Sequence, residues 1–170
     1  MTETKEILLT RIGMEALKSG LDYLKTEKRS EITEKIKVAR GFGDLSENAE
    51  YDEAKNEQAE VESKINQLVN MMKYTRTVTD DEIESGKVCI GNTIEIQEVG
   101  EDEIETYSIV SADEIEMYAL LNADMDDVLL SSSSPVGKAL LGHSAGETVS
   151  VETPACTIDF VIKNVYKYEE

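Results

Sequence analysis

Two carboxylates three residues apart are the strongest sign of chemistry in this sequence. Asp44 and Glu47 lie in the stretch Gly43–Tyr51, which interrupts a long helical pattern near its midpoint. Carboxylate oxygens are the ligands that hard cations such as Mg²⁺ prefer. At a projecting turn, this pair could be carried into the active site of another molecule and hold a cation there.

The same spacing also fits a purely structural arrangement. With Asp44 as the N-cap and Glu47 as the third helical residue, the two side chains would form a capping box that satisfies backbone N–H groups. Spacing alone favours this structural interpretation. The two roles are compatible, because an aspartate can cap a helix in the free protein and bind a cation in a complex. Glu50 is expected to lie on the helix surface.

Two helical arms are expected to position this turn. In the first arm, Thr10 is a helix cap, and apolar residues follow at spacings of three and four with one slip near Lys28. The second arm alternates spacings of three and four, which is the heptad pattern of a coiled coil. The seam residues are Leu17, Leu21, Leu24, Ile32, Ile36 and Ala39, then Tyr51, Ala54, Gln58, Val61, Ile65, Leu68 and Met72. Residues 1–76 are therefore predicted to form an antiparallel helical hairpin.

The period of the apolar residues changes to two after Lys87, which is typical of half-buried strands. We read residues 77–86 as a linker and residues 87–170 as a small antiparallel sheet domain. The segment 112–130 stays open between strand and helix. The predicted fold class is α+β.

One short helix is clearly marked within the sheet domain. Ser134 is its expected N-cap, Pro135 occupies the first helical position and Gly142 follows its end. Glycines at turn positions, as in Gly91-Asn92 and Gly100-Glu101, separate the expected strands.

The charge is divided unevenly between the two halves. The chain of 170 residues has a net charge of −19. Residues 1–76 hold 13 Lys and Arg against 15 Asp and Glu, whereas residues 77–170 hold 4 against 21. Because a phosphate backbone would repel the second half, any contact with nucleic acid should come from the first half. Acidity that serves only solubility explains the second half equally well.

The remaining composition points to the cytoplasm. No apolar run reaches the length of a signal-peptide core or a membrane span, which predicts a soluble cytoplasmic protein. Cys89 and Cys156 form no CxxC unit, and with one histidine, His143, no zinc site is expected. Both thiols are expected to be reduced and buried.

Three segments resemble the Gre family of bacterial transcript cleavage factors, and the GreA type most closely. They are residues 39–58 around the acidic pair, Ser134–Gly142, and Gly146–Pro154. The resemblance covers nearly the whole chain, and the tip segment is long and specific. One stretch departs from the family: residues 110–131 are longer here, and they lack an Asp-Pro pair that is usual at this position.

The resemblance implies a coiled-coil hairpin followed by an FKBP-like domain that binds RNA polymerase. In such a factor, the C-terminal domain docks at the rim of the secondary channel, on the β′ subunit. The hairpin tip then reaches the active centre, where Asp44 and Glu47 share Mg²⁺ with the polymerase. The factor is no enzyme and has no cofactor of its own; it stimulates the polymerase's endonuclease activity on backtracked RNA. The docking candidates are Ser134, Pro135, Gly137 and Lys138.

Basic residues near the tip are candidates for holding the 3′ end of the extruded RNA. They are Arg40, Lys37 and Lys55, with Lys35 further back and Tyr51 as a possible stacking partner. Cationic strips bind phosphates, although ordinary pairing with neighbouring glutamates explains these residues equally well. Strong binding of free nucleic acid is not expected.

Other functions fit the same architecture less well. A channel regulator that inhibits cleavage would need an altered tip, and here the Asp-x-x-Glu pair is intact. A prolyl isomerase needs an aromatic-lined pocket, for which the second half offers few aromatic residues. A coiled-coil adaptor without chemistry would be indifferent to the loss of Asp44 and Glu47.

Overall fold

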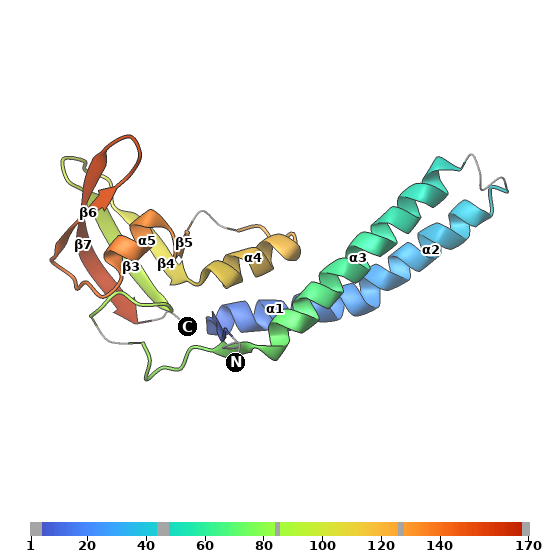
Figure 1. Ribbon diagram of the computed structural model, residues 1–170, viewed down its shortest axis with the longest axis horizontal. Helices are drawn as coiled ribbons and strands as arrows, with labels where there is room; N and C mark the ends of the chain where they lie inside the picture. The colour runs from blue at the N-terminus through green and yellow to red at the C-terminus, as the bar shows by residue number, and fades with distance from the viewer. Residues whose placement is uncertain (1–4, 44–47, 84–85, 126–127, 168–170) are drawn as a thin grey trace.

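A long helical arm projects from a small sheet domain in the computed structural model (Figure 1). The structure describes residues 5–43, 48–83, 86–125 and 128–167. The arm is an antiparallel pair of helical runs, and its free end lies far from the sheet. The predicted α+β class is confirmed.

The first run of the hairpin is continuous but not uniform. It comprises β1 (Ile7–Leu9), α1 (Arg11–Tyr23), the π-helical segment η1 (Leu24–Lys28) and α2 (Arg29–Arg40). Thr10 caps α1, as predicted, and accepts a hydrogen bond of 3.1 Å from the N–H of Gly13. Leu24 and Ile32 are eight residues apart, one more than a heptad, yet both are buried. The wider π-helical turn absorbs the extra residue, which explains the slip near Lys28.

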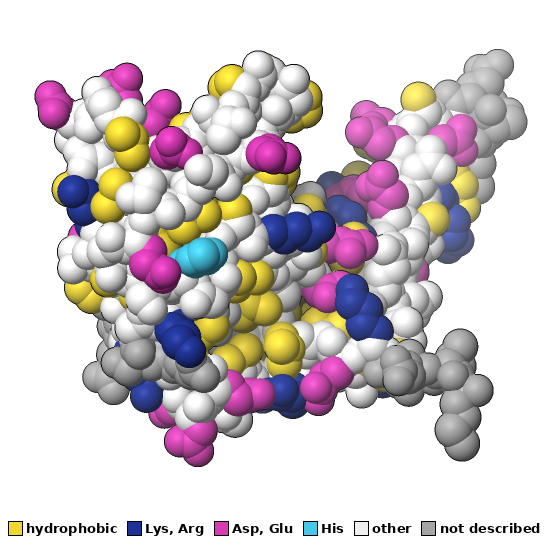
Figure 2. Space-filling view, turned by 60° about the vertical axis from the view of Figure 1, so that its left-hand side comes forward, with side chains coloured by type: hydrophobic (Ala, Val, Ile, Leu, Met, Phe, Trp, Pro, Cys, Tyr) yellow, Lys and Arg dark blue, Asp and Glu magenta, His cyan; other side chains and the backbone are white. Residues whose placement is uncertain are grey.

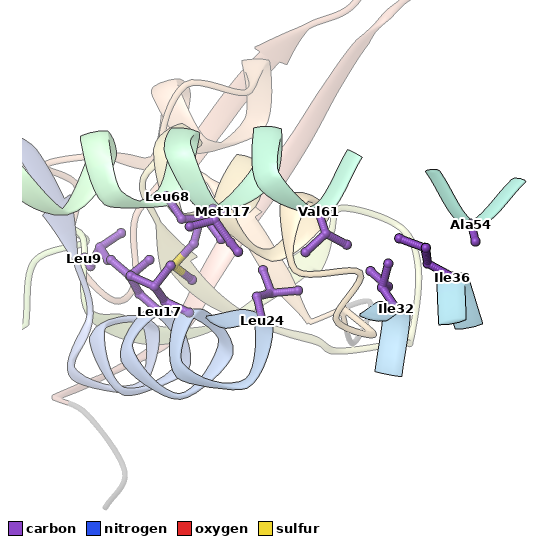
Figure 3. Close-up of a cluster of buried hydrophobic side chains, with 11 residues drawn as sticks. Leu9, Leu17, Leu24, Ile32, Ile36, Ala54, Val61, Leu68 and Met117 are labelled. Carbon is purple, nitrogen blue, oxygen red and sulfur yellow. The ribbon is translucent and has the colours of Figure 1, made fainter. Parts of the chain in front are cut away.

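The second run, α3 (Ala49–Lys73), packs antiparallel to the first along the predicted seam. Its buried residues are Ala54, Val61, Ile65 and Leu68, whereas Tyr51, Gln58 and Met72 are half-buried. Figure 3 shows side chains of both runs pointing toward one another along the hairpin, from Leu9 and Leu17 to Ile36 and Ala54. Burial of this stripe, worth about 25 cal/mol per Å² of apolar area, holds the two runs together.

Two elements close the base of the hairpin. The sequence did not predict the first of them, and it left the second open between strand and helix. β2 (Thr75–Thr77) spans the predicted boundary between the hairpin and the linker, where no strand was expected, and it pairs in parallel with β1. The open segment begins with a helix, α4 (Ala112–Leu120), which caps with Ser111 and packs against α1 and β1. Met117 from α4 is fully buried in the hairpin's own core. The base is therefore built from both halves of the chain.

The C-terminal sheet has five strands in the order β5-β4-β3-β7-β6. The strands are β3 (Asn92–Glu98), β4 (Glu105–Val110), β5 (Leu129–Ser131), β6 (Thr148–Glu152) and β7 (Thr157–Lys167), and the short helix α5 (Pro135–Leu140) packs against β5 and β6. The pairings are antiparallel except that of β4 with β5, which is parallel. The sheet is thus mixed rather than purely antiparallel, because the chain crosses over through α4 before forming β5. Leu140 and Ile162 are fully buried in its core.

Both cysteines are free thiols, but the expectation that they are buried is wrong. Cys156 is exposed in the turn between β6 and β7, and Cys89 is half-buried. Within the described ranges, no helix is both long enough and apolar enough to cross a membrane.

Candidate functional site at the hairpin tip

The acidic pair itself lies outside the described residues, so its surroundings define the site. Asp44 and Glu47 belong to the undescribed segment 44–47. On one side of it, α2 ends at Arg40 and the chain continues to Gly43, whose φ of +92° suits glycine. On the other side, α3 begins directly after Asn48.

Asn48, and not Asp44, caps the returning helix. The side-chain oxygen of Asn48 accepts a hydrogen bond of 3.1 Å from the N–H of Tyr51. The capping box expected for Asp44 and Glu47 is therefore wrong for α3, because another residue occupies its N-cap. The acidic pair itself lies outside the described residues, and α3 needs neither acid as its N-cap. Glu50 is exposed in the first turn of α3, as expected.

One flank of the distal hairpin carries the predicted basic residues. The guanidinium of Arg40 lies over the ring of Tyr51, 6.0 Å from its centre, so the ends of the two runs meet here. Residues three or four apart share a helix face. Lys37 therefore lies on the face of Arg40, and Lys55 lies on the face of Tyr51; both lysines are exposed. Lys55 also donates to Gln58 at 3.1 Å. The structure thus brings all four RNA-contact candidates to one flank.

The opposite flank is an acidic groove. It is lined by Glu31, Glu34, Lys35, Val38, Glu50, Glu53, Ala54 and Glu57. Lys35 points here, away from the basic flank, and its ammonium binds Glu57 at 2.8 Å. Lys28 binds the same carboxylate at 2.7 Å, so the two hydrogen-bonded lysines lower the pKa of Glu57. Five glutamates against one lysine would repel RNA phosphates, which leaves the flank of Arg40 as the only one of the two suited to an RNA strand.

The charges of the arm are visible on its surface. Figure 2 shows acidic and basic side chains together on the projecting arm, at the right of the view. Phe42, which was not singled out from the sequence, is 66% exposed, and Gly43 separates it from the undescribed segment. An exposed aromatic ring at this position offers an apolar contact to a partner; its placement after the last turn of α2 was the available signal.

The base of the hairpin has a buried carboxylate in a different setting. Glu114 of α4 is fully buried and accepts hydrogen bonds from Thr10, at 2.8 Å from its N–H and 2.7 Å from its hydroxyl. Burial raises the pKa of this carboxyl group, and the hydrogen bonds from Thr10 and Tyr118 oppose that shift. The carboxylate faces the N-terminus of α1, where the helix dipole favours negative charge. Glu114 therefore holds α4, from the C-terminal half of the chain, against the N-terminus of α1.

The four docking candidates, three in α5 and one at its N-cap, divide into two pairs. The hydroxyl of Ser134 caps α5 and donates to the carbonyl of Ser131 at 2.7 Å. Gly137 is buried, and a Cβ there would lie 2.9 Å from the carbonyl carbon of Ser131. These two residues hold α5 against the end of β5. Pro135 and Lys138 are exposed, so they are the members of the motif whose side chains can meet a partner.

The described residues hold no cluster of three His, Cys, Asp or Glu side chains able to bind a metal. Asp44 and Glu47, which lie outside the described residues, would supply two carboxylate ligands by themselves. Two oxygen ligands alone make a weak site for Mg²⁺, which keeps an octahedral shell.

Comparison with known families gives matches over both halves. Residues 7–76 match the family described as "Transcription elongation factor, N-terminal", and residues 83–167 match "Transcription elongation factor, GreA/GreB, C-term".

Curated relatives match over nearly the full length. Transcription elongation factor GreA of Caldanaerobacter subterraneus is 45% identical over 163 residues, which cover 95% of this chain and 98% of the relative. The factor of the same name from Clostridium perfringens is 45% identical over 165 residues. Among solved structures, GreA factor homolog 1 of Thermus thermophilus is 26% identical, with a TM-score of 0.41 and coverage of 95% of this chain and 99% of that one.

Proposed function

The chain belongs to the GreA/GreB family of transcription elongation factors, and we propose that it stimulates RNA polymerase to cleave backtracked RNA. The observation that carries this proposal is the far end of the arm. There, the two helical runs end far from the sheet domain (Figure 1), and in the sequence the two carboxylates lie between those ends. A thirty-residue helix spans about 45 Å, enough to carry a tip deep into a partner.

The proposed chemistry belongs to the polymerase, and this chain completes it. Asp44 and Glu47 would serve as oxygen ligands for a Mg²⁺ ion held jointly with the polymerase active centre. A cation held in this way lowers the pKa of a bound water and stabilises charge on the leaving oxygen. Because two carboxylates bind Mg²⁺ weakly by themselves, the chain is expected to have no nuclease activity alone.

The two flanks of the distal arm support a defined path for the RNA. The extruded 3′ end would follow the flank of Lys37, Arg40 and Lys55, where the ring of Tyr51 is also half-exposed. The acidic groove on the other side would exclude the strand by repulsion. The arm would thus confine the extruded RNA strand to the flank that carries Lys37, Arg40 and Lys55.

The sheet domain is proposed to dock on the polymerase. In this proposal, Pro135 and Lys138 contact the rim of the secondary channel on the β′ subunit, while Ser134 and Gly137 hold the docking helix in place. The strong acidity of residues 77–170 favours a basic or mixed surface over nucleic acid as the partner.

A regulator that enters the channel and inhibits cleavage is the competing function within this family architecture. The intact Asp-x-x-Glu pair favours stimulation, because an inhibitor has no need for two cation ligands at the tip. The two functions give opposite signs in one assay.

The test is RNA cleavage in elongation complexes that have been stalled and backtracked by a defined length. Purified chain is added with Mg²⁺, and shortening of 3′-backtracked, 5′-labelled RNA is followed over time. Faster shortening than in polymerase alone is the expected result, and the chain without polymerase should leave the RNA intact. Slower shortening would establish the inhibitor, and an unchanged rate would contradict both functions.

A further inference from the structure

The side-chain amide of Asn48 lies between the ends of the two helical runs and contacts both. Its Oδ1 accepts a hydrogen bond of 3.1 Å from the N–H of Tyr51, in the first turn of α3. Its Nδ2 donates a hydrogen bond of 2.6 Å to the carbonyl of Ala39, in the last turn of α2. The 39–48 contact closes the segment that contains the acidic pair.

The two partners fix the orientation of the amide. Tyr51 presents an N–H, which is only a donor, and Ala39 presents a carbonyl, which is only an acceptor. Turning the amide over would set nitrogen against the N–H and oxygen against the carbonyl, so both contacts would become repulsive. Only a side chain with a donor and an acceptor side by side satisfies both runs at once.

The contact joins two helix ends that need partners. The last carbonyls of α2 and the first N–H groups of α3 lack partners within their own helices. The carbonyl of Ala39 also accepts from the N–H of Phe42 at 3.2 Å, and Ala39 is 3% exposed. The hydrogen bond from Asn48 is therefore partly shielded from water and fixes the distance between the two ends.

We infer that Asn48 is a positioning residue for the tip: it caps α3 and clamps α3 to α2 at the point where the tip segment begins and ends. This inference rests on the proposed function, because positioning matters only if Asp44 and Glu47 must meet a cation in another molecule. Ligand groups misplaced by about 1 Å can lose on the order of a hundredfold in rate. The clamp therefore acts through the geometry of the acidic pair and not through contact with the substrate.

Two substitutions separate the clamp from the cap. Serine and aspartate are N-caps comparable to asparagine, so Asn48→Ser and Asn48→Asp keep the bond from Tyr51. Neither has an amide that can donate to Ala39 while accepting from Tyr51. They differ in charge, which controls for any effect of an added carboxylate near the tip. Asn56, exposed on the same helix, gives the matched control variant Asn56→Ser.

The functional measurement separates binding from rate. In backtracked elongation complexes, the maximal cleavage rate and the concentration for half-maximal effect are determined for each variant. Both Asn48 variants are expected to lose on the order of ten- to a hundredfold in maximal rate with an unchanged half-maximal concentration. Asn56→Ser should match the wild type. Wild-type rates for Asn48→Ser would overturn the inference, whatever Asn48→Asp does.

A second measurement needs no polymerase, so it tests the clamp even if the proposed function is wrong. In NMR of the free protein, the Nδ2 protons of Asn48 should exchange with solvent about tenfold more slowly than those of Asn56, as expected for one protected hydrogen bond. The Tyr51 N–H should stay protected in Asn48→Ser. Equal exchange at Asn48 and Asn56 would show that the clamp does not form in solution. If the wild type fails to stimulate cleavage while the clamp is present, the proposed function alone is wrong.

Discussion

The base and the distal end of the hairpin use opposite means to hold the same two helices. At the base, Leu17, Leu68 and Met117 are fully buried. Three further elements, β1, β2 and α4, also pack against the helices there. At the distal end only two runs remain, and small seam residues, Ala39 and Ala54, bring them together. Polar side chains take over there: Glu57 bridges two lysines, and Asn48 joins the helix ends.

This difference fits the proposed division of labour. Apolar burial is non-directional and strong, which suits a base that must keep the arm fixed to the sheet domain. Hydrogen bonds and ion pairs contribute less but fix distances and directions, which suits an end that must present two ligands accurately. Changes at the base should therefore lower stability, whereas changes at the distal end should lower activity.

The largest expected effect on stability is at Gly13, where α4 meets α1. A Cβ there would lie 2.5 Å from the carboxyl carbon of Glu114, which is held by Thr10 and cannot retreat. Gly13→Ala should lower the free energy of unfolding by about 1–3 kcal/mol, the usual cost of overpacking. This loss should appear although alanine favours a helix by about 1 kcal/mol.

Gly20→Ala is the matched control for this prediction in urea unfolding. It has the same gain in helix propensity, but its Cβ would meet both methyl groups at the flexible end of the Leu121 side chain. It should therefore cost less than Gly13→Ala. Equal free energies for the two variants would show that the contact with Glu114 does not constrain the base.

The next largest effect is expected on the rate of RNA cleavage, when basic residues of the flank of Arg40 are replaced. Arg40→Ala and Lys55→Ala should slow cleavage of long-backtracked complexes more than short ones, by roughly two- to tenfold at low salt, because a longer strand offers more phosphates. The difference should shrink at about 0.15 M salt, where charges are screened beyond roughly 8 Å. Lys35→Ala, on the acidic flank, should show no dependence on backtrack length or salt, because its ammonium binds Glu57 and points away from the basic flank. A loss that is uniform across backtrack length and salt would assign these residues to tip geometry instead.

Glu114→Gln should change how the stability of the base depends on pH. The folded-state pKa of Glu114 is raised above its ordinary value of 4.5 by burial, so the folded protein holds this proton more tightly than the unfolded one. Its contribution to stability is therefore present below pH 4.5 and is lost as the pH rises through the folded-state pKa. Relative to Glu114→Gln, the wild type should lose stability across that window. A difference in unfolding free energy that stays constant from about pH 4 to pH 7 would show that Glu114 is not desolvated.

The smallest change in unfolding free energy is expected at η1, the π-helical segment of the first helical run. Removing Thr26, which is exposed within η1, leaves Leu24 and Ile32 seven residues apart and restores the heptad. The unfolding free energy should stay within about 1 kcal/mol of the wild type, because the seam on both sides keeps its phase. A large loss would mean that the π-helical turn holds the two halves of the hairpin in a geometry that an α-helix cannot supply.

The local patterns of the sequence predicted the hairpin well and its surroundings less well. The heptad spacing identified the buried seam, and Ser134 with Pro135 identified α5, because caps and apolar periodicity are local signals. The π-helical turn was visible as a slip in spacing. The packing of α4 on the hairpin joins Thr10 to Glu114, 104 positions apart, and no local pattern encodes such a contact. The parallel pairing of β4 with β5 depends likewise on how the intervening α4 packs.

The candidate site, too, depends on contacts that no local sequence pattern encodes. The acidic pair and its basic neighbours stay predictions, made from residue type, spacing and the family resemblance, and the structure added the division of the distal arm into two flanks. The role of Asn48 was missed, since the capping pattern fitted Asp44 equally well in the sequence. Only the position at which α3 begins decides between the two caps. The placement of Lys35 on the acidic flank likewise follows from the packing of the two helices.

The central claim is that the distal end supplies two cation ligands while the rest of the chain supplies placement. The most direct measurement is cleavage in backtracked complexes by the double variant Asp44→Asn, Glu47→Gln, with polymerase binding measured on the same samples. Stimulated cleavage should fall to the rate of polymerase alone, while affinity for polymerase and the unfolding midpoint stay at wild-type values. Cleavage at the full wild-type rate by this double variant would contradict it.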